Sequence, residues 1–305
     1  MSKTLKIVKL MGGLGNQMFQ YAFGKALQKS TGHPVLYDLS WFEEAKKTIV
    51  GETGCNKDGI CIREYEIHIF PNIKIDTATS KQVKQCKKGF LSKFIKKILN
   101  KRKNNHYYEK NAFDFESELF KIKGNAYYEG YFQNENYLKD IKSELKTHFE
   151  LPSLRIDDQY NNNLISKIKQ YNNSVFVHVR REDYEKMGCI VSLDYYKNAV
   201  KYIIDRIDNP KFFVFCAEDP KWIKENFNIG TEYELIGEQN KTRATFYENM
   251  RLMMACKHAI IANSSYSWWA AWLSDFEGKI VIAPSPWMNN QDEIICHNWI
   301  KIENK

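Results

Sequence analysis

The segment His178-Val-Arg-Arg-Glu-Asp-Tyr184 carries two arginines just after the apolar run 175–177. The apolar run predicts a buried strand, so both guanidinium groups should lie near the end of that strand. Arginine is always charged, and its rigid fork of donors fits phosphate oxygens. The carboxyl end of a parallel sheet is also where α/β proteins bind ligands. The segment therefore predicts a diphosphate site, although an isolated Arg-Arg pair more often forms a surface salt bridge.

Other polar side chains stand close to this pair in the sequence. His178 directly follows the apolar run and could be a structural histidine or a ligand contact. Asp183 could orient the arginines or act as a general base. Glu218 and Asp219 follow the next predicted strand, residues 212–216. They could cap a helix or accept hydrogen bonds from a nucleobase or a ribose.

A second polar cluster, Asn263-Ser-Ser-Tyr-Ser-Trp-Trp269, follows the predicted strand 259–262 and opens a predicted helix. Free N–H groups and hydroxyls at a helix start favour anions. Helix capping alone needs only one of these residues. The excess of hydroxyl and amide groups predicts phosphate binding by Asn263, Ser264, Ser265 and Ser267. Trp268, Trp269 and Trp272 are expected in the core, although one of them could border a sugar or a base.

The N-terminal loop Gly12-Gly-Leu-Gly-Asn-Gln17 could form a third anion site. Gly13 and Gly15 fit the first two glycines of a dinucleotide fingerprint, and Asp38 lies at a suitable distance for a ribose. Met18 occupies the third glycine position, and no Gly-Lys-Ser/Thr follows. Asn16 and Gln17 would add side-chain amides. A tight turn with a helix cap is the alternative.

The elements that position these motifs alternate between strand and helix. A strand at 5–10, a helix opening at Asn16 or Gln17 and a strand at 35–38 predict a parallel β-α-β unit. A short strand at 127–132 and a helix at 138–149 should follow. The second half contains predicted strands at 175–179, 212–216, 259–262 and 279–283, with helices between them, among them 193–207.

Residues 151–154, Leu-Pro-Ser-Leu, are the best candidate for a linker. We therefore predict two doubly wound, Rossmann-like α/β domains that face one another, residues 1–150 and 151–305. The last ~20 residues could pack back on the first domain.

Composition excludes several classes of protein. No window approaches the ~20 apolar residues of a membrane span. The seven cysteines contain no C-x-x-C pair, which predicts reduced thiols, a cytoplasmic location and no structural metal. The net charge of the chain is +8, and residues 81–103 alone carry a charge of +10. The rest of the chain therefore has a net charge of −2, which is not typical of a nucleic-acid-binding protein. Phe90, Phe94 and Ile98 predict an amphipathic helix there. It could dock on an anionic membrane or simply pack on its own domain.

Taken together, three separated motifs resemble those of the bacterial α-1,2-fucosyltransferases of glycosyltransferase family eleven. These are Gly12-Gly-Leu-Gly-Asn-Gln-Met-Phe-Gln-Tyr-Ala22, His178-x-Arg-Arg-x-Asp183 and Ile261-Ala-Asn-Ser-Ser-Tyr-Ser-Trp-Trp269. The resemblance implies a GT-B fold, GDP-β-L-fucose as donor and the 2-hydroxyl of a terminal galactose as acceptor. It also implies inversion at the anomeric carbon and no metal or other cofactor. The basic segment 81–103 itself suggests work at the inner membrane face, on a surface glycan such as O-antigen.

By resemblance, Arg180 holds the β-phosphate and stabilises departing GDP, while Arg181 and His178 support that site. Asn16, with Gln17 and the glycines beside it, would reach the fucose or the diphosphate. Asp219, with Glu218, would contact the nucleoside. Two departures stand out: Glu182 replaces the family's usual glycine, and Cys216-Ala-Glu-Asp219 replaces Ser-Asp-Asp.

Two other functions fit parts of the sequence. A dinucleotide-dependent oxidoreductase would use the first glycine loop and Asp38. A membrane-surface or RNA-binding adaptor would use residues 81–103. Each leaves the Arg-Arg and Asn-Ser-Ser clusters unexplained.

Overall fold

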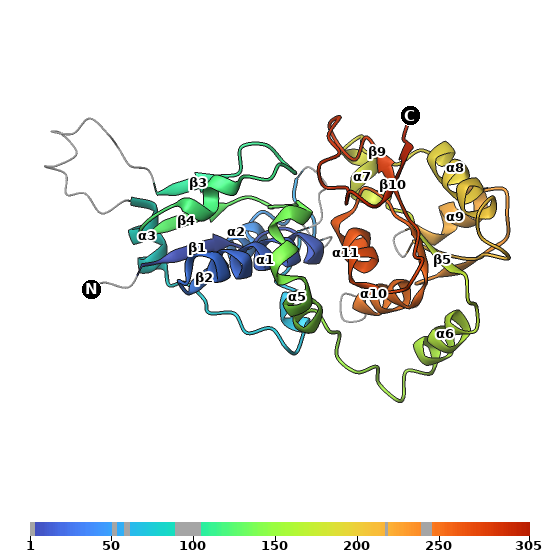
Figure 1. Ribbon diagram of the computed structural model, residues 1–305, viewed down its shortest axis with the longest axis horizontal. Helices are drawn as coiled ribbons and strands as arrows, with labels where there is room; N and C mark the ends of the chain where they lie inside the picture. Colours follow the sequence, from blue (N-terminus) through green and yellow to red (C-terminus); the bar gives the residue numbers. More distant parts are fainter. Residues whose placement is uncertain (1–3, 51–53, 58–61, 89–104, 217–218, 239–245) are drawn as a thin grey trace, which may run out of the picture. The chain divides into compact units, whose positions relative to one another are not determined.

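The computed structural model describes residues 4–50, 54–57, 62–88, 105–216, 219–238 and 246–305 (Figure 1). The chain divides into two compact units, residues 1–150 and 151–305. Each unit is built on one parallel sheet with helices packed against it. The predicted α/β architecture with two parallel sheets is therefore confirmed.

The N-terminal unit contains a four-stranded sheet of order β2-β1-β4-β3, with every pairing parallel. Its strands are β1 (Lys6–Lys9), β2 (Val35–Asp38), β3 (His106–Tyr108) and β4 (Ala126–Glu129). Helix α1 (Leu14–Thr31) joins β1 to β2 and ends at Gly32, whose φ of 68° is the left-handed conformation that glycine adopts without strain. The predicted β-α-β unit is confirmed, but α1 begins two residues earlier than expected.

Shorter elements complete this unit. They are α2 (Ser40–Lys46), η1 (Ile67–Ile69), α3 (Ser80–Lys88), η2 (Ser117–Lys121), η3 (Glu135–Tyr137), η4 (Lys139–Ile141) and α5 (Lys142–His148). The helix predicted at 138–149 is thus wrong in its first turn, which is a separate 3₁₀ turn that precedes α5. Of the basic segment, only residues up to 88 are described, and the predicted stripe of Phe90, Phe94 and Ile98 lies outside the described residues.

The C-terminal unit contains a six-stranded parallel sheet of order β10-β9-β8-β5-β6-β7. Its strands are β5 (Ser174–His178), β6 (Lys211–Phe215), β7 (Tyr233–Ile236), β8 (His258–Ile260), β9 (Val281–Ser285) and β10 (Ile300–Glu303). Its helices are α6 (Gln159–Lys169), α7 (Glu182–Lys186), α8 (Leu193–Ile204), α9 (Pro220–Asn226), α10 (Phe246–Ala255) and α11 (Ser265–Leu273). Counted from β5, this is the 3-2-1-4-5-6 order of dinucleotide-binding folds.

The end of the chain belongs to this second sheet. Strand β10 pairs in parallel with β9, with Ile300 opposite Ile282. The Asn304 side chain also accepts a hydrogen bond from the Ser192 backbone N–H at 2.8 Å. The last strand therefore completes its own unit, where the sequence left open a return to the N-terminal domain. The sequence pattern did not predict strands β7 and β10 of this sheet, nor β3 of the first sheet.

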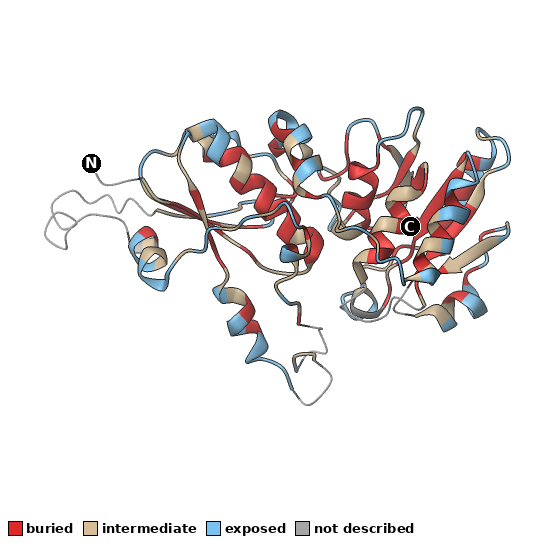
Figure 2. Cartoon of the chain, turned by 90° about the horizontal axis from the view of Figure 1, so that it is seen from below, coloured by how far each residue is buried: buried red, intermediate tan, exposed pale blue. Residues whose placement is uncertain are grey.

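The core of the C-terminal unit explains its continuous apolar strands. All five residues of β5 are buried, as are four of the five in β6 (Figure 2). A parallel strand covered by helices on both faces requires this pattern. Tyr196, Ala199, Val200 and Ile203 of α8 are buried as predicted. The predicted core role of the tryptophans is also confirmed, since Trp268 and Trp269 are fully buried and Trp272 is only 6% exposed.

No helix in the described part of the chain is long and apolar enough to span a membrane.

Candidate functional site

The topology of the C-terminal sheet brings the two polar clusters together. From β5 the chain adds β6 and β7 on one side of the sheet, and β8, β9 and β10 on the other. Adjacent strands β5 and β8 therefore form the switch point, where loops diverge at the carboxyl ends and leave a crevice for ligands. Residues 179–181 follow β5, and residues 261–264 follow β8. The Arg-Arg and Asn-Ser-Ser clusters thus follow adjacent strands of one sheet, and a diphosphate site beside them stays a prediction.

The two adjacent arginines have different surroundings. Arg181 is only 8% exposed. Its guanidinium contacts Glu185 at 3.2 Å and Asp219 at 3.6 Å, and stacks on the Trp222 ring at 3.7 Å from the centroid. Arg180 is partly exposed, and its guanidinium lies 5.4 Å from the ring centroid of Tyr184. Arg181 thus fixes its loop against α9, and ligand contact by the more exposed Arg180 stays a prediction.

His178 ends β5 as a buried, neutral side chain. Burial lowers its pKa to about 3, and the positive charge of Arg180 acts in the same direction. Its Nδ1 atom has no hydrogen-bond partner among the described residues, and its ring lies 6.0 Å from that of Tyr266 on α11. A side chain whose pKa lies this far below neutral pH is a poor general base there, because it holds a proton only weakly. The environment therefore favours a hydrogen-bonding role for His178 over proton abstraction.

The start of α11 supplies donors at the end of β8. Ser264 is the N-cap residue, with an extended backbone and no side-chain capping bond, and Ser265 begins the nine-residue helix. The first N–H groups of a helix lack partners within the helix, and the helix dipole favours an anion there. Asn263 is 3% exposed, and its Oδ1 has no partner in the described part of the chain. A buried amide oxygen without a partner is costly, so it provides a second sign of a ligand at this turn.

Ser267 lies underneath this turn. It is fully buried, and its hydroxyl donates to the Ser264 carbonyl at 3.2 Å. In this structure the buried hydroxyl is therefore not accessible to a phosphate. We therefore assign Ser267 to the support of the turn, and leave Asn263, Ser264 and Ser265 as the residues able to face a ligand.

Asp219 caps the N-terminus of α9, which was one of the two roles predicted for it from the sequence. Its Oδ1 accepts the Trp222 backbone N–H at 3.1 Å, and Pro220 occupies the first turn of α9. Its Oδ2 faces Arg181, and its side chain remains 37% exposed. Contact of Asp219 with a nucleoside stays a prediction. Glu218 lies outside the described residues, as do the side chains of Glu182 and Asp183 within α7.

The glycine loop of the N-terminal unit differs from a phosphate-binding loop. The Leu14 N–H at the start of α1 donates to Glu66 Oε2 at 3.1 Å, so a carboxylate of the protein already lies at this helix terminus. Gly13 is the N-cap with an ordinary φ of −76°, and Gly15 is buried inside the helix. Contact of Gly13 and Gly15 with a donor stays a prediction.

Gln17 is an internal brace. It is fully buried, and its Nε2 donates to the carbonyls of Gly12 at 2.8 Å and Glu64 at 2.7 Å. Its Oε1 accepts the N–H groups of Glu66 at 2.9 Å and Ile67 at 3.1 Å. All four hydrogen bonds that a side-chain amide can make are therefore used within the protein. The predicted contact of Gln17 with a donor sugar would require one of them to break.

Asn16 lies at the switch point of the first sheet, between β1 and β4. Its Oδ1 accepts a hydrogen bond from Gln133 at 2.7 Å. A Cβ on Gly12, whose φ is +75°, would come within 2.7 Å of the Asn16 amide nitrogen, so this close approach requires glycine.

Glu109 accepts the N–H groups of Tyr131 and Phe132 at 2.8 and 2.9 Å. Burial raises the pKa of Glu109.

Sequence reasoning missed Gln133 and Glu109. For Gln133 the available signal was its position directly after the predicted strand 127–132. Glu109 directly follows β3, which the sequence pattern did not predict, so it carried no such signal.

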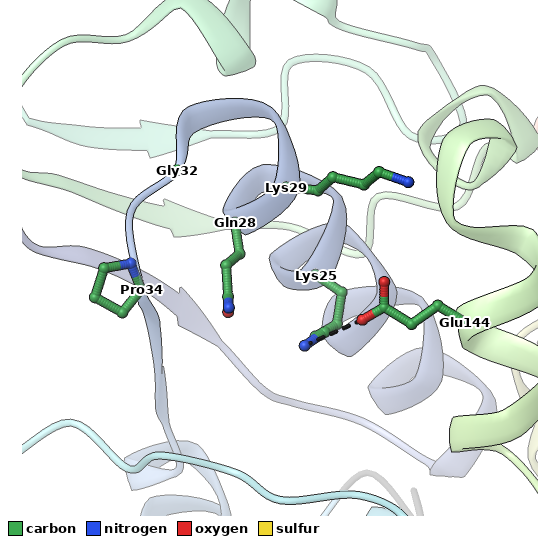
Figure 3. A pocket seen from close by; sticks show the side chains of 6 residues that line it. All are labelled: Lys25, Gln28, Lys29, Gly32, Pro34 and Glu144. Atoms are coloured by element: carbon green, nitrogen blue, oxygen red, sulfur yellow. Dashed lines mark ion pairs between the residues drawn. The ribbon is translucent and has the colours of Figure 1, made fainter.

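A pocket of about 460 Å³ lies at the opposite end of α1 (Figure 3). It is lined by Lys25, Gln28, Lys29, Gly32, Pro34 and Glu144. Lys25 is paired with Glu144 at 3.2 Å. The 18 residues of α1 span about 27 Å, so this pocket is far from the carboxyl ends of the strands. We do not assign it to the reaction.

Comparison with known proteins agrees with the motifs. The sequence model of the family described as "Glycosyl transferase family 11" matches residues 58–303. An α-1,2-colitosyltransferase of Escherichia coli is 30% identical, covering 98% of this chain and 99% of that protein. The O-antigen biosynthesis glycosyltransferase WbnK of Escherichia coli is 29% identical, covering 96% and 99%.

Solved structures with some similarity include two fucosyltransferases. NodZ from Bradyrhizobium aligns with a TM-score of 0.42 and 10% identity, covering 89% of this chain and 93% of that one. A mutant of Arabidopsis thaliana FUT1 in complex with GDP aligns with a TM-score of 0.46 and 11% identity, covering 92% and 70%. The family model and the sequence relatives, which extend over nearly the whole chain, decide the assignment. This chain is a glycosyltransferase and belongs to glycosyl transferase family 11.

Proposed function

We propose that this enzyme transfers L-fucose from GDP-β-L-fucose to the 2-hydroxyl of a terminal galactose, with inversion at the anomeric carbon. The observation that carries the proposal is the parallel pairing of β5 and β8, whose carboxyl ends lead to Arg180 and to the start of α11. A guanidinium and a helix N-terminus are both suited to a diphosphate. Family membership and the α-1,2 linkage in the name of one relative support this reaction.

The proposed reaction depends on stabilisation of the charge on the leaving group and does not require a covalent intermediate with the enzyme. As the glycosidic bond to GDP breaks, negative charge develops on the β-phosphate. Arg180, the first N–H groups of α11 and the hydroxyls of Ser264 and Ser265 would stabilise that charge. Neutral His178 would add a hydrogen bond, and Arg181 would hold the loop in place.

The galactose hydroxyl attacks the oxocarbenium-like carbon from the opposite face. Asp183 is our candidate for its proton acceptor, which a late deprotonation makes less demanding. Because these fixed charges do the work of a cation, we expect the reaction to continue in EDTA.

The donor sugar has a second candidate. One relative is an α-1,2-colitosyltransferase, and colitose is fucose without its 3-hydroxyl. GDP-colitose is therefore the alternative donor. The O-antigen role in the name of the other relative supports a surface glycan as acceptor. We assign the acceptor to the N-terminal unit, beside Asn16.

We also propose that the enzyme works at the inner face of the bacterial membrane, where the +10 charge of residues 81–103 would attract anionic lipids.

The test is a donor and acceptor panel with the purified enzyme. GDP-fucose and GDP-colitose are each mixed with lactose and other β-galactosides in excess EDTA, and GDP release is measured. NMR of the product gives the linkage and the anomeric configuration. We expect an α-1,2-linked deoxyhexose on galactose. Failure of both donors, or a product linked elsewhere, would refute the proposal.

A further inference from the structure

Tyr184 connects the two loops that flank the candidate diphosphate crevice. It lies on α7, four residues after Arg180, and its ring centroid is 5.4 Å from the Arg180 guanidinium. Its hydroxyl donates to the Asn263 carbonyl at 3.2 Å, in the turn that leads into α11. One side chain therefore contacts both the arginine at the end of β5 and the turn at the end of β8.

A second set of hydrogen bonds closes this connection. The Asn263 side-chain nitrogen donates to the Cys189 carbonyl at 2.9 Å. The Cys189 backbone N–H in turn donates to the Tyr184 carbonyl at 3.0 Å. The three contacts form a ring through Tyr184, Cys189 and Asn263, which we call the loop clamp. Neither loop can shift without breaking at least one of these bonds.

We propose that Tyr184 is a positioning residue for the donor diphosphate, with its ring orienting Arg180 and its hydroxyl fixing the turn before α11. The proposal rests on the donor site proposed above. Phosphate oxygens can be met from both sides only if the two loops keep a set separation. Residues that lock such groups in advance remove an ordering cost from binding and reaction.

The test separates phosphate recognition from general stability. Guanosine and GDP are titrated by calorimetry into the wild-type enzyme, Tyr184→Phe and Tyr184→Leu. If the clamp positions phosphate contacts, the ratio of GDP to guanosine affinity falls while guanosine affinity stays the same. Tyr184→Phe removes only the hydroxyl and should lower the ratio about 3- to 10-fold. Tyr184→Leu also removes the ring and should lower it about 10- to 30-fold.

Tyr202 on α8 offers a matched control, because Arg206, just after that helix, stacks on its ring at 3.7 Å from the centroid. Tyr202→Phe and Tyr202→Leu should leave the affinity ratio unchanged. An unchanged ratio in both Tyr184 variants would overturn the positioning role, including when their melting temperatures fall. A wild-type enzyme that binds GDP no better than guanosine would overturn the donor site itself, which distinguishes the two failures.

Discussion

Replacing Arg180 by alanine should lower the kcat for transfer by about 100-fold, with a smaller effect on guanosine binding. Arg180 is the partly exposed member of the arginine pair, beside the crevice between β5 and β8. Negative charge develops on the leaving diphosphate only as the bond breaks. The arginine therefore stabilises the transition state more than the ground state, and its loss should appear mainly in kcat.

The magnitude follows from the environment of Arg180. Two unit charges about 4 Å apart attract by about 4 kcal/mol at an effective dielectric constant of about 20, and by about 2 kcal/mol at about 40. Arg180 lies at the edge of a buried strand but is partly exposed, so its dielectric environment falls between these values. Each 1.36 kcal/mol changes a rate about tenfold, which gives a loss of roughly 30- to 1,000-fold.

The assay is GDP release under saturating donor and acceptor, with single-turnover measurements to isolate the chemical step. Arg180→Lys keeps the charge but loses the fork of donors, so it should fall between alanine and wild type. Arg206→Ala is the matched control, since Arg206 stacks on a tyrosine outside the crevice. If Arg180→Ala folds normally and stays within threefold of wild-type kcat, the assignment of Arg180 is wrong.

Three further predictions concern other residues. Gln17→Ala should lower the free energy of unfolding, measured by urea titration, by about 2–4 kcal/mol, because it leaves buried backbone groups without their hydrogen-bond partner. GDP affinity should not change. Weaker GDP binding with unchanged stability would contradict this prediction. Ser265→Ala should weaken GDP binding several-fold, whereas Ser267→Ala should only lower the melting temperature, and the reverse order would restore Ser267 as a ligand contact. The folded-state pKa of His178, about 3, lies below that of an unfolded histidine near 6.5. Its contribution to stability is therefore complete above pH 6.5 and lost as the pH falls toward 3. His178→Gln should flatten the decline in unfolding free energy between pH 6.5 and 4, and a slope equal to wild type would exclude this origin.

Patterns of apolar residues were sufficient to predict most strands of both sheets. Strand β5 is apolar throughout because helices cover both of its faces, and this burial appears directly in the sequence. Strand β7, Tyr-Glu-Leu-Ile, lies at the edge of its sheet and is less buried. Strand β10 alternates between partly buried and exposed residues. Edge strands have only one neighbour and weaker burial, so their apolar signal was too weak to detect.

The glycine loop shows where a motif and its environment disagree. Gly13 and Gly15 have the spacing of a phosphate-binding turn, yet Glu66, some 50 residues later, places its carboxylate on the Leu14 N–H. Three of the four hydrogen bonds of the Gln17 side chain likewise go to backbone groups of residues 64–67. No local pattern could reveal these partners, because they come from a distant segment.

The sequence by itself determined that the chain has two α/β halves and that arginine, serine and asparagine clusters follow its buried strands. It did so because burial and strand-end position are recorded in residue type along the chain. Only the tertiary structure decided which arginine remains accessible, since Glu185, Asp219 and Trp222 enclose Arg181 but not Arg180. The two arginines are chemically identical and adjacent in the sequence, so their exposure depends on contacts with residues distant in the chain. Those contacts cannot be read from the sequence pattern.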